Sequence, residues 1–144
     1  MSSIPKSRDE AVAFARSFFD LSDSLVPSQM ASAFSRDGSL HFANHPALNS
    51  RDAINDAMVG RFSLLDHMKH NIVSSDVVGN TVYTVVSIEY RAKGDSLDNI
   101  VTIPAAANLD LVVDDGIVKV KALHVFIDDA PLREKIAALQ EETK

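Results

Sequence analysis

Residues 118–132, near the end of the chain, combine residue types that can transfer protons. They read VKVKALHVFIDDAPL and set His124, Asp128 and Asp129 among valine, leucine, isoleucine and phenylalanine. Histidine can give and take a proton near neutral pH, and burial or a neighbouring charge shifts the pKa of either group. If these side chains face a cavity, the stretch indicates general acid and base chemistry.

Strand alternation predicts where these side chains point. His124, Phe126 and Asp128 share one side-chain parity, and the lysines of the stretch have the opposite one. Unless a bulge intervenes, we expect the lysine-free face to line a cavity and Asp129 to cap the following helix. In the alternative, His124 hydrogen-bonds a cross-strand partner and Asp128 is the cap.

Four further polar residues are candidates for the same chemistry. His70 lies where a predicted helix gives way to a strand, and Asp20 lies near the end of the first predicted helix. A carboxylate at a helix C-terminus is electrostatically unfavourable, which favours a functional purpose for Asp20. Tyr90 and Asn108 are suitable hydrogen-bond donors to a developing enolate oxygen.

Two pairs of histidines raise the question of a metal site. His67 and His70 are spaced i, i+3, and His41 and His45 lie close together in the sequence. No third ligand has a convincing spacing, and the chain contains no glycine-rich phosphate loop or nucleotide fingerprint. We therefore expect neither a metal nor an organic cofactor.

The composition is that of a single globular domain spanning residues 1–144. Of the 144 residues, 46% are hydrophobic and 24% are charged. The net charge of −6, with basic residues scattered singly, argues against nucleic acid as a partner. The chain has no cysteine, no secretory signal pattern and no apolar run of membrane-spanning length. We expect a soluble, cytoplasmic protein that binds no membrane.

Helical spacing dominates the first half of the chain. Ser7 begins a capping box, which predicts a first helix over residues 8–20, and Pro27 begins a short second helix. Ser50 can cap a third helix that continues to about residue 66 and is expected to be the long helix of the domain.

Strands are predicted between and after these helices. The Asp-Gly pair at 37–38 predicts a turn, followed by a short strand at 39–43 that buries Leu40 and Phe42. In the second half, period-two runs separated by turn signals predict four antiparallel strands, and Pro131 begins a last amphipathic helix. This order predicts an α+β domain with helices on one face of a curved sheet that can close around a pocket.

The last predicted strand is apolar on both faces, which an antiparallel sheet with one solvated face does not usually show. We therefore expect the outer face of the sheet to be buried in a homodimer.

Several local strings resemble a known superfamily. They are FSRDGSLHF, SRDAI at the start of the third helix, MKH at the start of a strand, and DGIV followed by VFID near the end. In these strings and in element order the chain resembles the nuclear transport factor 2-like superfamily, and its SnoaL-like branch above all. The resemblance implies a cone-shaped α+β barrel around an apolar cavity. Known members include polyketide cyclases, ketosteroid isomerases, scytalone dehydratases, epoxide hydrolases and proteins without catalysis.

Similarity to scytalone dehydratase, which uses an aspartate, two histidines and an asparagine, implies specific site residues. Its aspartate corresponds to Asp20, its first histidine to His70 and its asparagine to Asn108. Its second histidine falls near Ser87, where this chain has no imidazole unless His124 fills the same space.

The other branches imply different residues. The carboxylate base of the ketosteroid isomerases aligns with Phe42, which cannot abstract a proton. The SnoaL-like cyclases point instead to Asp128, at the end of the last strand, and to His70.

These observations predict a small cofactor-independent enzyme that binds an apolar oxygenated molecule, polyketide-like or terpenoid-like, and catalyses acid–base cyclisation, isomerisation or dehydration. His70 and Asp128 would exchange protons, assisted by Asp20 or His124. The residues expected to shape the pocket are Phe42, Asn44, Tyr90, Asn108 and Phe126. The alternative is a non-catalytic module of the same fold for small-molecule binding or dimerisation.

Overall fold

A computed structural model describes residues 2–142, which form four helices and five strands. The helices are α1 (Arg8–Asp23), α2 (Pro27–Ala31), α3 (Arg51–Phe62) and α4 (Ala130–Glu142). The strands are β1 (Phe34–Phe42), β2 (Leu65–Val78), β3 (Thr81–Ala92), β4 (Val101–Asp114) and β5 (Ile117–Ile127).

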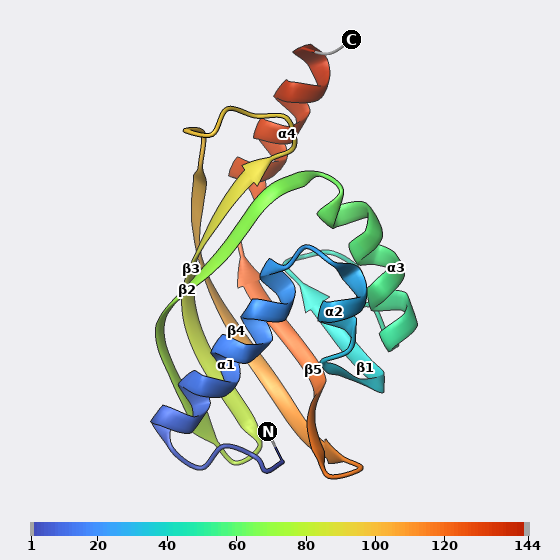
Figure 1. Cartoon of the computed structure of the whole chain (residues 1–144), viewed down its shortest axis with the longest axis vertical. Helices are drawn as coiled ribbons and strands as arrows, with labels where there is room; N and C mark the ends of the chain where they lie inside the picture. The colour runs from blue at the N-terminus through green and yellow to red at the C-terminus, as the bar shows by residue number, and fades with distance from the viewer. Residues whose placement is uncertain (1, 143–144) are drawn as a thin grey trace.

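The strands form one mixed sheet in the order β1-β5-β4-β3-β2. Strands β2 to β5 pair antiparallel, as the predicted meander, and β1 pairs parallel with β5. In Figure 1 the long strands curve behind α1 and α2, α3 lies beside β1, and α4 extends from one end of the sheet. This arrangement confirms the predicted α+β cone, with a sheet that does not close.

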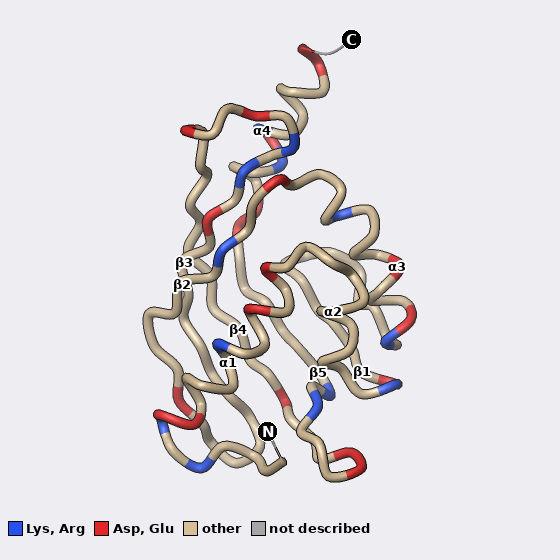
Figure 2. The backbone as a smooth tube through the Cα atoms, in the orientation of Figure 1, with Lys and Arg blue, Asp and Glu red and all other residues tan. Residues whose placement is uncertain are grey.

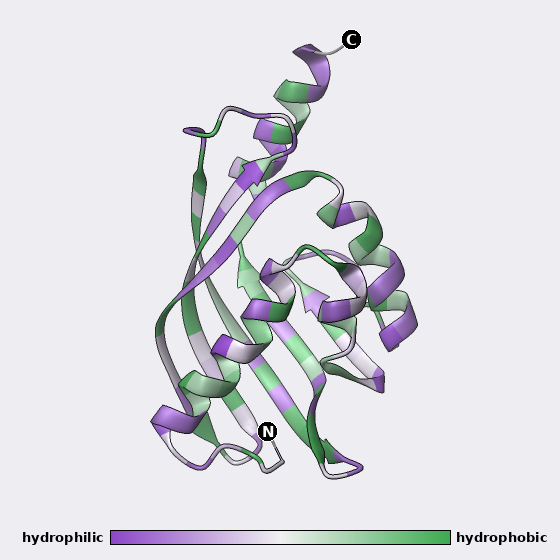
Figure 3. Ribbon diagram, viewed as in Figure 1, coloured by the Kyte–Doolittle hydropathy of each residue, from purple (hydrophilic) through white to green (hydrophobic). Residues whose placement is uncertain are grey.

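Charged and apolar residues follow this layout. Figure 2 shows acidic and basic residues in small groups over helices and loops, without a continuous basic stripe along the visible backbone. Figure 3 shows hydrophobic and hydrophilic residues alternating along the strands, as expected for two distinct sheet faces. None of the helices within residues 2–142 has the length and apolar character needed to cross a membrane.

The two longer N-terminal helices begin at the predicted caps. The Ser7 hydroxyl accepts a hydrogen bond from the Glu10 N–H at 3.2 Å, and the Ser50 hydroxyl accepts one from the Ala53 N–H at 3.0 Å. Helix α1 continues three residues beyond its predicted end, to Asp23, whereas α3 stops at Phe62. The expectation that α3 is the longer helix is therefore wrong, since α1 has 16 residues and α3 has 12.

Strand β1 is longer than the predicted strand at 39–43, and the turn predicted at 37–38 is wrong. Those two residues lie inside β1, where its pairing with β5 shifts register. A Cβ on Gly38 would lie 3.0 Å from the carbonyl oxygen of Val120, so glycine permits the close approach of the two strands here. Leu40 is buried, as predicted.

One extra residue in β5 reverses the predicted faces of that strand. Leu111 of β4 pairs with Val120, but Asp110 pairs with Ala122, which leaves Lys121 as a bulge. Before the bulge the even-numbered residues of β5 are buried, and after it the inward positions are odd-numbered. The prediction that even-numbered residues near the end of β5 face a cavity is therefore wrong.

Candidate active site

The inner face of the sheet and the four helices enclose a cavity of about 530 Å³. Its walls are mainly apolar and include Phe62, Ile88 and Leu123. A volume of this size is in the range that holds a small organic ligand. The polar residues that reach the cavity are Ser22, His45, Arg61, His70, Tyr90, Asp129 and Arg133.

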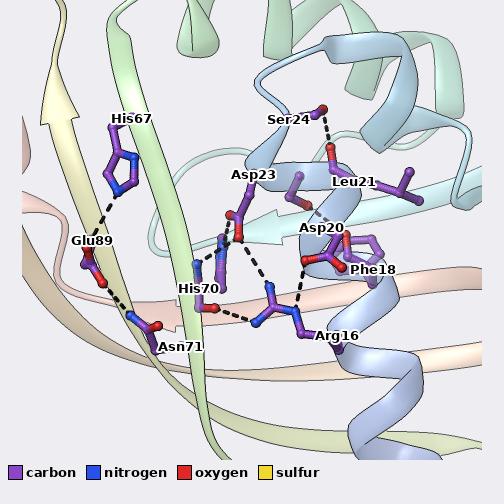
Figure 4. A network of polar contacts seen from close by, with 11 residues as sticks. Arg16, Phe18, Asp20, Leu21, Asp23, Ser24, His67, His70, Asn71 and Glu89 are labelled. Atoms are coloured by element: carbon purple, nitrogen blue, oxygen red, sulfur yellow. Dashed lines mark hydrogen bonds and ion pairs between the residues drawn. The ribbon is translucent and has the colours of Figure 1, made fainter.

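The histidine on the cavity wall is held by a carboxylate from the end of α1. One oxygen of Asp23 lies 2.5 Å from His70 Nδ1, and the other accepts a hydrogen bond from the His70 N–H at 2.9 Å (Figure 4). Both side chains are largely buried, with exposed fractions of 11% for His70 and 12% for Asp23. The His70 ring also stacks on Phe19, with centroids 4.3 Å apart. The imidazole therefore has a fixed position.

Arg16 joins this pair to the backbone. Its Nη1 donates to the His70 carbonyl oxygen at 2.7 Å, and its Nη2 lies 3.4 Å from Asp23 Oδ2. Figure 4 shows these contacts connecting α1 to the inner edge of β2. The guanidinium gives the Asp23 carboxylate a counter-charge, so an ion pair and an imidazole form one network.

This geometry sets which ring nitrogen of His70 carries the proton. A carboxylate accepts hydrogen bonds, so the contact with Asp23 selects the tautomer protonated at Nδ1. No hydrogen bond from residues 2–142 engages Nε2. Nε2 is then a proton acceptor on a residue that lines the cavity.

Tyr90 lies near His70 on the same face of the sheet. It pairs with Met68 in the β2–β3 ladder, one inward position from His70, so the two side chains are diagonal neighbours. Burial raises the pKa of Tyr90 to about 12, with Arg61 opposing and Asp129 adding to the shift. Its hydroxyl therefore remains a hydrogen-bond donor at neutral pH.

Arg61 places a positive charge on the cavity wall. Its guanidinium carbon lies 3.8 Å from the centre of the Phe42 ring, a cation–π contact. Burial lowers the pKa of Arg61, and the nearby Tyr90 and Asp129 partly offset that shift. Phe42 was predicted to shape the pocket, and it does line the cavity.

A second acidic group reaches the cavity at the start of α4. Asp129 accepts a hydrogen bond from Arg133 Nε at 2.9 Å and lies 3.3 Å from His45 Nε2. Burial raises the pKa of Asp129, but the hydrogen bonds from Arg133 and His45 outweigh it, so the pKa lies below its usual value. Asp129 therefore carries a negative charge next to two potential cations.

Asp20 does not reach the cavity. It is 63% exposed at the side chain and pairs with Arg16 Nε at 3.0 Å on the outside of α1. The helix continues one further turn and presents Asp23, three residues later, to His70. The resemblance to scytalone dehydratase assigned the carboxylate to Asp20, whereas in the structure Asp23 makes the contact with His70.

His124 and Asn108 lie on the outer face of the sheet and do not line the cavity. They are direct cross-strand partners, and His124 in turn stacks on His41, with ring centroids 4.3 Å apart. The placement of His124 in the cavity is wrong because of the bulge at Lys121. The placement of Asn108 is wrong because the inward residues of β4 are odd-numbered between 103 and 111.

The remaining predicted site residues are also outside. Asp128 is exposed and accepts a hydrogen bond from the Ala130 N–H at 3.1 Å, so it caps α4 while Asp129 points inward. This is the reverse of the expected assignment. Phe126 is 59% exposed on the outer face, and Asn44 is exposed in the turn after β1.

Sequence reasoning missed the polar residues that approach the cavity from helices. Arg61 follows Ile54 and Met58 at helical spacing, so it shares the apolar face of α3, and a charge at such a position is a usable signal. Asp23 repeats Asp20 at i, i+3 on α1. Within residues 2–142, no cluster of three or more histidine, aspartate or glutamate side chains could hold a metal ion.

Solved structures with the same fold carry several different descriptions. A protein described as a SnoaL-like polyketide cyclase from Shewanella putrefaciens superposes with a TM-score of 0.72 at 16% identity, over 94% of this chain and 99% of that one. A protein described as a scytalone dehydratase from Novosphingobium aromaticivorans gives 0.67 at 22%, over 83% and 84%. ActVI-ORFA from Streptomyces coelicolor gives 0.67 at 16%, over 83% and 94%.

At the level of sequence, no family model matches the chain, and no curated protein matches it either. Structural similarity at identities below 25% establishes the fold, so the activity must be inferred from the residues of the site. The backbone of this chain superposes on all three solved structures, so it has the nuclear transport factor 2-like fold that SnoaL-like and scytalone dehydratase-like proteins share.

Proposed function

We propose that this protein is a small, cofactor-independent enzyme that moves protons on an apolar, oxygenated molecule held in the cavity. The observation that supports the proposal is the Asp23–His70 pair, whose imidazole stands on the wall of a mainly apolar cavity. His70 keeps its predicted role as base, and Asp23 takes the assisting role expected of Asp20. Asp128 and His124 have no role in this revised site.

In the proposed reaction, His70 Nε2 removes a proton from a carbon next to a ligand carbonyl. The resulting imidazolium faces the Asp23 carboxylate, which stabilises the new positive charge and holds the ring in position. The Tyr90 hydroxyl donates a hydrogen bond to the carbonyl oxygen as negative charge develops there.

The fate of the enolate decides the reaction type. Return of the proton to another carbon gives an isomerisation, and attack of the enolate on a second carbonyl gives a cyclisation. Loss of a β-hydroxyl group, protonated by the imidazolium, gives a dehydration and releases water. Proteins described as polyketide cyclase and scytalone dehydratase share the fold, which supports a polyketide-like substrate; a terpenoid-like substrate stays a prediction.

The competing function is ligand binding without turnover. It is favoured by the apolar character of most of the cavity wall and by the positions of His124 and Asn108 outside the cavity, since the resemblance to scytalone dehydratase implied that they belong to the site. This function predicts that a ligand binds equally well with or without an imidazole at position 70.

Deuterium exchange into a model ketone separates these functions without knowledge of the natural substrate. 1-Tetralone is apolar and has exchangeable protons next to its carbonyl, and proton NMR in D₂O follows their loss. We expect the protein to accelerate this exchange, and His70→Gln to reduce the catalysed rate by roughly 100-fold or more. His124→Gln is the matched control on the outer face and is expected to keep the wild-type rate.

Equal exchange rates for His70→Gln and wild type would contradict the assignment of His70 as base. Binding of 1-tetralone without accelerated exchange in the wild type would favour the non-catalytic function.

Two further predictions from the sequence accompany this proposal. A homodimer through the outer sheet face stays a prediction; it is supported by Tyr83, Val85 and Phe126, which are 47%, 45% and 59% exposed on that face. A cytoplasmic location also stays a prediction.

A further inference from the structure

Arg61 lacks the carboxylate or carbonyl partner that three other arginines of the described chain have. Arg16 and Arg133 pair with carboxylates, and Arg51 donates two hydrogen bonds to the Phe34 carbonyl oxygen. Within residues 2–142, no hydrogen bond or ion pair is made by the Arg61 guanidinium; its close contact is the face of the Phe42 ring, at 3.8 Å.

An unpaired guanidinium on an apolar wall is energetically unfavourable. Charged groups that leave bulk water are normally paired or hydrogen-bonded, and burial does lower the pKa of Arg61. The nearest acidic group on the wall, Asp129, is already bound by Arg133 at 2.9 Å and by His45 at 3.3 Å. Arg61 is therefore a positive charge on the cavity wall that Asp129 does not pair, and it lines space that a ligand can fill.

Tyr90 adds a second donor without a partner in the described chain. The residue is 5% exposed and lines the same cavity, and it lies close enough to Arg61 for each to act on the pKa of the other. A buried hydroxyl normally finds a hydrogen-bond partner. Arg61 has donors only, the Tyr90 hydroxyl has one donor, and no hydrogen bond joins the two residues within residues 2–142. Each is therefore available to a separate acceptor on the ligand, Tyr90 to the carbonyl oxygen of the proposed reaction and Arg61 to a second oxygen group.

We propose that Arg61 binds a carboxylate of the ligand, and that the cavity is therefore selective for apolar organic acids. A guanidinium presents parallel N–H donors that match the two oxygens of a carboxylate, and the ring of Phe42 fixes the plane from which they are presented. The inference deepens the proposed function and rests on it for the use of this cavity by a ligand. It assigns the substrate's anchoring group, whereas His70 acts on the reacting carbon.

A matched pair of probes tests this selectivity by binding alone. 2-Naphthoate and 2-naphthamide have the same apolar body and differ in the charge of one group, and isothermal titration calorimetry measures both. We expect wild type to bind 2-naphthoate about tenfold or more tightly than 2-naphthamide, because hydrogen bonds to a charged group are worth more than neutral ones.

Arg61→Met should abolish that preference, because it weakens the binding of 2-naphthoate and leaves the binding of 2-naphthamide unchanged. Binding of the neutral probe also reports that the cavity has formed, and Arg61→Gln is a second variant if the methionine variant does not fold. Arg36→Met, an exposed arginine on β1, removes the same formal charge and should keep the wild-type preference.

An unchanged preference in Arg61→Met and Arg61→Gln, or a wild type that does not prefer 2-naphthoate, overturns the inference. These outcomes are independent of the exchange assay with 1-tetralone. If His70→Gln exchanges 1-tetralone at the wild-type rate and still prefers 2-naphthoate, the proposed reaction is wrong and the anion site stands. If His70→Gln loses catalysed exchange but Arg61→Met keeps the preference for 2-naphthoate, only the anion site is wrong.

Discussion

Asp23 at the end of α1 binds both the ring and the backbone of His70, with Oδ1 2.5 Å from Nδ1 and Oδ2 2.9 Å from the backbone nitrogen. Two contacts from one carboxylate fix the rotation of the imidazole as well as its tautomer. Because Asp23 is on a helix and His70 is on a strand, this pair also links the two layers of the fold.

The tautomer of His70 is a direct consequence of this contact. At a pH where the ring is neutral, we expect nitrogen-15 NMR to show the proton on Nδ1, and Asp23→Asn to disturb this state. His124, which lies on the outer face, serves as the internal reference in the same spectra. A His70 ring protonated at Nε2 in the wild type would remove the proton acceptor from the cavity and contradict the proposed geometry.

Asp129 should contribute to stability in a pH-dependent way. Its pKa is held below the ordinary value of 3.8 in the folded chain, so its contribution is complete above about pH 4 and is lost as the pH falls through the folded pKa. Asp129→Asn should lower the free energy of unfolding by about 1–2 kcal/mol at pH 7, since it weakens charge-assisted hydrogen bonds.

Urea denaturation at several pH values measures this difference. The gap between wild type and Asp129→Asn should shrink as the pH falls below about 4, following the loss of the carboxylate. Asp128→Asn is the control, because asparagine retains the hydrogen bond that caps α4. If the difference in free energy of unfolding between wild type and Asp129→Asn is the same at pH 7 and pH 3, the charge of Asp129 does not contribute to stability.

Tyr90 should ionise only in strongly alkaline solution. The chain has two tyrosines, so Tyr83→Phe leaves Tyr90 as the only phenol that ultraviolet absorbance can follow. We expect a midpoint of about 12. Because a raised pKa stabilises the folded state below the unfolded value of 10.0, stability should fall as the pH rises from there towards 12. A midpoint near 10 in a chain that is still folded by circular dichroism is incompatible with a buried Tyr90.

The outer face of the sheet carries the predicted dimer contact. Val85, Ala106 and Phe126 are successive cross-strand partners on β3, β4 and β5, so they form one apolar row. We expect sedimentation to give the mass of two chains for the wild type and of one chain for Phe126→Asp. Val59→Asp, at an exposed position on α3, should remain dimeric. A monomeric wild type would refute the dimer and leave the cavity site unaffected.

Several parts of the fold that depend on local sequence were predictable, although the turn predicted at 37–38 was wrong. Ser7 and Ser50 cap their helices because each hydroxyl accepts a hydrogen bond from the backbone N–H three residues later. The turns at 79–80 and 115–116 contain residues that adopt positive φ readily. The family resemblance alone implied a site role for His70, which lines the cavity in the structure.

The parts that depend on pairing between distant strands were not predictable. The bulge at Lys121 depends on the pairing of β5 with both β4 and β1. This single extra residue places His124 on the outer face, and Asp129 rather than Asp128 points inward. Asp23 was missed because its function depends on α1 extending one turn further, over the start of β2.

The most direct test of the central claim compares two aspartates of α1 in the 1-tetralone exchange assay. Asp23 and Asp20 both contact Arg16, but Asp23 alone of the two binds His70. We predict that Asp23→Asn lowers the catalysed exchange rate by roughly 100-fold or more, while Asp20→Asn keeps the wild-type rate. Equal rates for the two folded variants would contradict the claim that the Asp23–His70 pair performs the chemistry.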